Sequence, residues 1–138
     1  MTAPILEPSP ASAAEIVERF LAASMLPDPA TAARYISPDL KITFTGGRRM
    51  RHPSETAAFN ADRYKWVKKK MERSDVVPGA SATIVYNLGT LYGEWPDGTP
   101  FGGNRYVDRF VVRDGKIVEM EVWNDSAEHL LTRHGITA

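Results

Sequence analysis

The feature that most constrains this fold is an aspartate placed among apolar residues in the stretch from Arg105 to Asn124. On both sides of Asp114-Gly115 apolar and polar residues alternate, which predicts two antiparallel strands joined by a turn. In the first strand Asp108 falls on the apolar face, between Tyr106 and Phe110. An unpaired buried carboxylate is costly or takes up a proton. Asp108 is therefore either a satisfied structural acid or part of a pocket.

The turn between these strands has to join faces of the same kind. A two-residue loop at Asp114-Gly115 would set Asp108 opposite Glu121 and mix the faces. We therefore expect a three-residue loop that begins at Arg113, with Gly115 at positive φ in a bulge. This register pairs Asp108 with Met120 and Arg109 with Glu119. It turns Val118, Met120, Val122 and Asn124 toward the side of Asp108, and Ile117, Glu119, Glu121 and Trp123 away from it.

Charge and cysteine content limit the classes of partner. Lysine plus arginine equals aspartate plus glutamate at 17 each, so no global basic field is available for nucleic acid or an acidic membrane. Cysteine is absent, which excludes thiolate metal sites and thiol nucleophiles. We expect no metal, no cofactor, no nucleic acid and no membrane span. A small molecule and a second copy of the chain are the expected partners, in the cytoplasm.

The order of elements predicts one α+β domain over residues 12–134, after a flexible N-terminal tail over residues 1–11. The fold class we expect is a cone-shaped curved antiparallel sheet with helices packed on its concave face, enclosing an apolar cavity. The predicted elements are a helix that Pro27 ends, a short helix capped by Asp28, a strand over 40–45 with 48–51 pairing back on it, a long helix from His52 to about Arg73, strands over 81–95, 101–113 and 116–124, and a final helix over 126–133.

A basic cluster stands at the end of the predicted long helix. It consists of Lys68, Lys69, Lys70 and Arg73. Cations are favoured at a helix C-terminus, because they compensate the helix dipole. We therefore interpret the cluster as solvated and assign it no ligand.

Several segments resemble the nuclear transport factor 2-like superfamily, specifically its SnoaL-like and ketosteroid-isomerase-like members. The resemblance covers about Glu15 to Leu131. It is carried by Ile16-Val-Glu-Arg-Phe-Leu21, Pro38-Asp-Leu-Lys-Ile42, Arg105-Tyr-Val-Asp-Arg-Phe110, Asp114-Gly-Lys-Ile-Val118 and Trp123-Asn-Asp125. The superfamily hosts isomerases, dehydratases, cyclases, epoxide hydrolases and binding domains, so the resemblance implies a fold more firmly than a reaction.

Only some of the functional residues of the superfamily have a counterpart in this sequence. Asp108 matches the isomerase aspartate that an apolar site keeps protonated, so that it donates a hydrogen bond to an oxyanion. Phe20 stands where the isomerase has its oxyanion tyrosine, and Phe44 stands near its general-base aspartate. Val122 stands where cyclase-like and epoxide-hydrolase-like relatives carry an acid.

His52 is the first candidate for a general base, because it begins the long helix at the mouth of the cavity and histidine is a common general base in enzymes. The alternative for His52 is a helix-capping role. The expected function is that of a cofactor-free isomerase, cyclase or dehydratase acting on an apolar or aromatic oxygenated substrate. In it Asp108 and His52 are catalytic, Asp108 as a buried acid and hydrogen-bond donor. The alternatives are a ligand-binding module and a dimerising scaffold. The expected substrate-binding residues are Phe20, Phe44, Tyr64, Tyr86, Tyr106, Phe110, Met120, Val122 and Asn124.

Overall fold

The structure is a computed structural model that describes residues 10–136, so residues 1–9 of the predicted tail lie outside the described part. The first helix begins at Pro10. The elements are α1 (Pro10–Met25), α2 (Pro29–Ala32), η1 (Ala33–Tyr35), β1 (Ile36–Phe44), η2 (Thr45–Gly47), β2 (Arg48–Met50), α3 (Pro53–Arg63), β3 (Trp66–Val77), β4 (Thr83–Glu94), β5 (Pro100–Arg113), β6 (Lys116–Asn124) and α4 (Ser126–Arg133).

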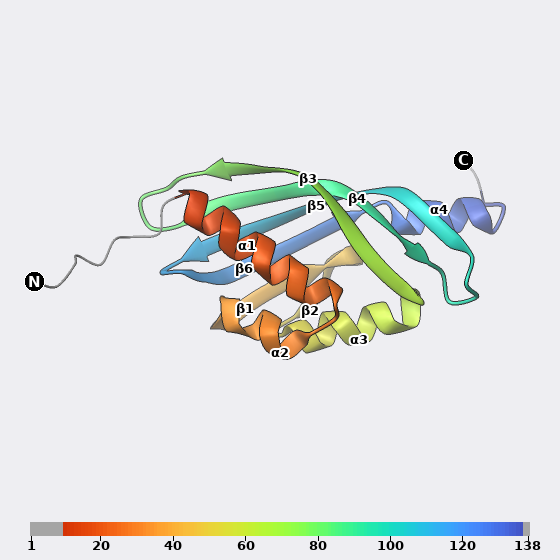
Figure 1. Cartoon of the computed structure of the whole chain (residues 1–138), viewed down its shortest axis with the longest axis horizontal. Helices are drawn as coiled ribbons and strands as arrows, with labels where there is room; N and C mark the ends of the chain where they lie inside the picture. The colour runs from red at the N-terminus through yellow and green to blue at the C-terminus, as the bar shows by residue number, and fades with distance from the viewer. Residues whose placement is uncertain (1–9, 137–138) are drawn as a thin grey trace, which may run out of the picture.

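Six strands form one curved, open sheet in the order β2-β1-β6-β5-β4-β3. Neighbouring strands are antiparallel except β1 and β6, which are parallel. Helix α1 lies across one face of the sheet, α2 and α3 lie beside β1 and β2, and α4 lies near the C-terminal end of β6 (Figure 1). The α+β class predicted from the sequence, with helices on the concave face, is therefore confirmed.

The long helix predicted to reach Arg73 is wrong in its second half. Helix α3 ends at Arg63, and the following residues form the edge strand β3, paired antiparallel with β4. Two glycines of β4 allow this pairing, because a Cβ at Gly89 would collide with the Lys70 carbonyl and one at Gly93 with the Trp66 carbonyl. Lysines on an edge strand discourage pairing with other chains. Solvated charges on an edge strand therefore produced the pattern that we interpreted as a helix surface.

The register predicted for the β5–β6 hairpin is also wrong. Asp114 and Gly115 both have positive φ, 51° and 75°, and form a two-residue turn that pairs Arg113 with Lys116. The expected bulge occurs further along, where Val118 is the extra residue between the pairs Val111–Glu119 and Val112–Ile117.

This bulge restores the match of the two faces. Asp108 lies opposite Val122 and is fully buried on the apolar side. Arg109 lies opposite Glu121 on the other side and donates to both Glu119 and Glu121, over 3.3 and 3.0 Å. Ile117, which we expected on that outer side, is instead buried next to Val112.

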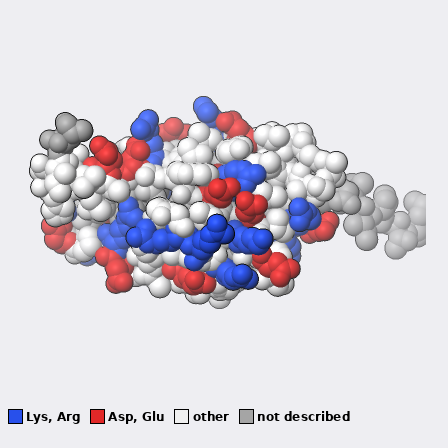
Figure 2. All heavy atoms as spheres, turned by 180° about the vertical axis from the view of Figure 1, so that it is seen from behind, with Lys and Arg blue, Asp and Glu red and all other residues white. Residues whose placement is uncertain are grey.

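The core lies between α1 and the concave face of the sheet. Val17, Phe20 and Leu21 of α1 are buried there. The rings of Phe20 and Phe110 meet edge to face at 5.9 Å between centroids. The face of the molecule opposite to α1 carries basic and acidic side chains intermixed (Figure 2). Among residues 10–136 no helix is long and apolar enough to cross a membrane.

Candidate functional site

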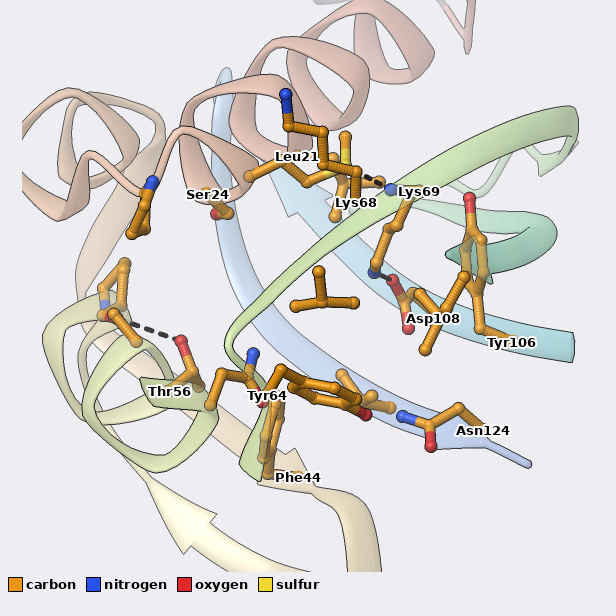
Figure 3. A pocket seen from close by; sticks show the side chains of 18 of the residues that line it. Leu21, Ser24, Phe44, Thr56, Tyr64, Lys68, Lys69, Tyr106, Asp108 and Asn124 are labelled. Carbon is orange, nitrogen blue, oxygen red and sulfur yellow. Dashed lines mark hydrogen bonds and ion pairs between the residues drawn. The ribbon is translucent and has the colours of Figure 1, made fainter. Parts of the chain in front are cut away.

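A small cavity lies between the C-terminal end of α1, helix α3 and the concave face of strands β3 to β6. Its volume is about 80 Å³. Figure 3 shows its labelled walls: Leu21 and Ser24 come from α1, Thr56 from α3, and Asp108 and Tyr106 from β5. The full lining is mostly apolar and consists of Leu21, Ser24, Met25, Pro27, Pro29, Phe44, Pro53, Thr56, Ala57, Asn60, Tyr64, Val67, Lys68, Lys69, Leu91, Tyr106, Asp108, Met120, Val122 and Asn124.

The polar centre of this cavity is an ion pair between Lys69 and Asp108. Lys69 points inward from β3, and its Nζ donates to Oδ2 of Asp108 (Figure 3). The Asp108 side chain is fully buried, and the Lys69 side chain is 15% exposed. The Lys69 ammonium also lies 4.4 Å from the centroid of the Tyr106 ring. Lys69 reaches the site because, along β3, the half-buried Val67 and Lys69 alternate with the exposed Trp66, Lys68 and Lys70.

Burial and the lysine act on Asp108 in opposite directions. Burial raises the pKa of the Asp108 carboxyl, and the neighbouring Lys69 ammonium lowers that pKa again. Only one carboxylate oxygen is used by Lys69. The other, Oδ1, is buried and has no hydrogen-bond partner among the described residues. The site therefore presents a free acceptor beside an ammonium group, at low local dielectric.

A second set of polar side chains holds the Tyr106 ring in place. The Tyr106 hydroxyl donates to Oδ1 of Asn87 over 2.6 Å, and Nδ2 of Asn87 donates to Ser74 over 3.1 Å. Burial, with the negative charge of Asp108, raises the pKa of Tyr106. Because its hydroxyl is committed to Asn87, Tyr106 contributes a ring face to the cavity more than a donor.

The opposite wall is fixed by the first residue of α4. Ser126 is fully buried, and its hydroxyl oxygen accepts from the Tyr64 hydroxyl over 2.6 Å and from Nδ2 of Asn104 over 3.2 Å. The Ser126 backbone N–H donates to Oδ1 of Asn124 over 3.0 Å. This leaves the Nδ2 group of Asn124 as a further donor at the cavity wall (Figure 3).

Comparisons with known proteins identify the fold. No family model and no curated protein matches the chain. Among solved structures, a nuclear transport factor 2-like protein of unknown function from Burkholderia pseudomallei K96243 is 18% identical, with a TM-score of 0.70 over 92% of this chain and 98% of that one. The chain has the nuclear transport factor 2-like fold.

Two further structures with this fold are similar to the chain. A proposed SnoaL-like polyketide cyclase from Jannaschia sp. CCS1 is 16% identical, with a TM-score of 0.67 over 95% of each chain. A proposed ketosteroid isomerase from Shewanella frigidimarina NCIMB 400 is 16% identical, with a TM-score of 0.66 over 81% of this chain and 94% of that one. The superfamily resemblance read from the sequence is thus supported at the level of the fold.

Within this nuclear transport factor 2-like fold, most of the expected site residues come together. The seven that line the cavity are Phe44, Tyr64, Tyr106, Asp108, Met120, Val122 and Asn124. Phe20 and Phe110 do not line it, because they pack against each other inside the core. Tyr86 is also misplaced: it pairs with Arg109 and therefore lies on the outer face of the sheet.

His52 does not take part in the site. It caps α3, where its Nδ1 accepts from the Ser54 backbone N–H over 3.0 Å, and its side chain faces solvent. It is not among the residues that line the cavity. The prediction of His52 as the general base is therefore wrong, and the capping alternative is correct.

Sequence reasoning missed Lys69, because it placed this residue on a helix end. Two signals could have found it. Residues 66–77 lack the apolar stripe of an amphipathic helix, whereas a spacing of two puts Val67, Lys69 and Met71 on one side. Gly89 and Gly93 in the next strand also provide room for a close neighbour. Across residues 10–136 no cluster of three or more His, Asp or Glu side chains could hold a metal ion.

Proposed function

We propose that this chain is a small-molecule pocket protein that works as a cofactor-free isomerase, cyclase or dehydratase on an apolar oxygenated substrate. The observation that carries the proposal is the Lys69–Asp108 ion pair at the centre of a mostly apolar cavity. Buried titratable groups with a specific charge partner inside a cavity are candidates for catalysis. The similarity in fold to a proposed cyclase and a proposed isomerase is consistent with this class.

The three reactions share one first step. A base removes a proton from the carbon next to a carbonyl group, and negative charge develops on the carbonyl oxygen. The resulting enolate is then protonated at another carbon by an isomerase, attacks a second carbonyl in a cyclase, or expels a β-hydroxyl group in a dehydratase. A single site with one base and one oxyanion donor therefore serves all three outcomes.

The two charged groups have complementary roles in that step. Lys69 donates from its ammonium group to the carbonyl oxygen, where the low dielectric strengthens the interaction as charge develops. Asp108 accepts the proton from carbon at its free oxygen Oδ1, and the neutral carboxyl then returns it. In this assignment Lys69 takes the role of oxyanion donor that the sequence led us to expect of Asp108, and Asp108 serves as the base that His52 was expected to provide.

A binding module without turnover is the second candidate. The direct contact between Lys69 and Asp108 favours this candidate. An ion pair of this kind also binds a ligand, because the ammonium donates to a ligand carbonyl and the carboxylate accepts from a ligand hydroxyl. Such a module would use Asp108 Oδ1 as the acceptor for the hydroxyl. It would leave the ligand chemically unchanged.

Proton exchange on carbon separates the two candidates without knowledge of the natural substrate. Cyclohexanone and hydroxyacetone are incubated with the protein in D₂O, and loss of their α-proton signals is followed by NMR. We expect exchange above the buffer rate, a loss of about a hundredfold or more in Asp108→Asn, and a loss of about a hundredfold in Lys69→Met. Lys70→Met is the matched control, because Lys70 is exposed and lines no part of the cavity. Binding of these ketones without exchange would refute turnover and support the binding module.

A further inference from the structure

A second cavity adjoins the mouth of the first. Its volume is about 260 Å³, larger than that of the inner cavity. The two cavities share wall residues that include Met25, Tyr64 and Val67. Four residues at the junction of α1, α3 and β3 line the outer cavity but not the inner one: Leu26, Ala61, Lys65 and Trp66. The outer cavity therefore lies directly beside the cavity that holds the Lys69–Asp108 pair.

The outer cavity carries large apolar side chains that the fold does not bury. Leu26 is 74% exposed and Trp66 is 39% exposed. The Trp66 ring is turned toward the outer face of the sheet, where its Nε1–H donates to Oε2 of Glu94 over 2.5 Å and its ring meets the Tyr92 ring at 5.9 Å between centroids, so Leu26 is the large apolar side chain left free at the outer cavity. An exposed apolar side chain at the wall of a cavity favours contact with an apolar ligand group.

The inner cavity alone is too small to enclose a typical organic ligand. Pockets that enclose small organic ligands usually measure about 300 to 1,000 Å³. The inner cavity, at about 80 Å³, accommodates only a small head group, and the two cavities together reach the lower end of the usual range. Lys69 and Asp108 form the charged pair of the inner cavity, Lys68 lines both cavities and Lys65 the outer one, and most of the other wall residues are apolar.

We propose that the outer cavity is a second subsite, which holds the apolar extension of an elongated ligand whose hydroxy-carbonyl head binds at Lys69 and Asp108. This inference rests on the proposed function only for the position of the head group. Leu26 and Ala61 contact the extension, an alkyl chain or a second ring. The substrate class is thus an amphiphilic ketone with a neighbouring hydroxyl, longer than the inner cavity holds.

The test is the dependence of affinity on ligand length. Hydroxyacetone and its 1-hydroxy-2-alkanone homologues, up to about nine carbons, are titrated into the protein and followed by NMR. In the outer subsite each added methylene should lower the dissociation constant by about fourfold. Ala61→Trp fills the outer cavity from an exposed position and should abolish this gain. Leu26→Ser should reduce it.

Ala58→Trp is the matched control, because Ala58 is an exposed residue of the same helix that lines neither cavity. It should keep the wild-type dependence on length. Wild-type affinity independent of length, or an equal gain in Ala61→Trp and the wild type, would overturn the subsite. Lys69→Met tests the head group separately through hydroxyacetone alone. If Lys69→Met binds hydroxyacetone normally while the length effect still disappears in Ala61→Trp, the head-group assignment fails and the subsite stands.

Discussion

Replacing Lys69 by methionine should make the stability of the fold strongly dependent on pH. The substitution leaves the Asp108 carboxyl fully buried without its counter-charge. Removing one partner of a buried ion pair costs about 3 to 5 kcal/mol. Protonation of Asp108 limits this loss, because neutralising a carboxyl of unfolded pKa about 3.9 at pH 7 costs about 4 kcal/mol. We therefore expect the free energy of unfolding to fall by about 3 to 4 kcal/mol at pH 7.

The sign of the pH effect follows from where the proton is bound. Burial already raises the pKa of Asp108 in the folded state, and loss of Lys69 removes the effect that lowers it. Above about pH 4 the folded variant then holds a proton that the unfolded chain releases, so stability falls by about 1.4 kcal/mol per pH unit. The deficit of Lys69→Met should therefore shrink to about 1.5 kcal/mol at pH 5.

Urea unfolding followed by circular dichroism between pH 5 and pH 8 measures these differences. Lys70→Met is the control for loss of a lysine from β3, and it should remain near the wild type at every pH. The double variant Lys69→Met/Asp108→Asn contains neither charge, so its deficit relative to the wild type should lack the steep slope. A Lys69→Met variant as stable as Lys70→Met, or one whose deficit grows toward acid pH, would refute the buried ion pair.

Two further predictions concern the capping histidine and the outer face. His52→Ala removes the cap of α3 and should cost about 1 kcal/mol in urea unfolding, with α-proton exchange unchanged; a loss of exchange would return His52 to the site. A groove of about 600 Å³ on the sheet is lined by Leu88, Val107 and the 53% exposed Trp123. We expect a symmetric dimer through this face in light scattering at micromolar concentration, which Trp123→Glu should dissociate; a monomeric wild type would contradict it.

The sequence predicted which face of a strand each residue occupies better than it predicted the pairing register of neighbouring strands. Alternation alone placed Asp108 on the apolar face, and that face is buried in the structure. It did not locate the bulge, because Val118 and its neighbours in β6 are compatible with several positions for an extra residue. A two-residue turn with a bulge further along and a three-residue turn give Asp108 the same orientation. The turn prediction failed although the burial prediction succeeded.

The partner of Asp108 was harder to predict, because it depends on a contact between distant parts of the chain. Lys69 lies 39 positions before Asp108, on a strand that is separated from β5 by β4. Locally, only its spacing of two from Val67 and Met71 distinguishes it from Lys68 and Lys70, which are exposed. His52 was similarly ambiguous, since capping and catalysis require the same residue at the start of a helix. Only the position of such a residue in the folded structure decides which role it has.

The parallel pairing of β1 with β6 has a consequence for folding during synthesis. Strand β6 is the last to be made, yet it lies between β1 and β5 in the sheet. Until residues 116–124 have left the ribosome, β1 and β5 both present unpaired edges, and the floor of the cavity that Met120 and Val122 provide is missing. The cavity therefore stays incomplete during synthesis until the last strand, β6, has been made. A nascent chain that stalls before Lys116 therefore exposes apolar surface to chaperones or to aggregation.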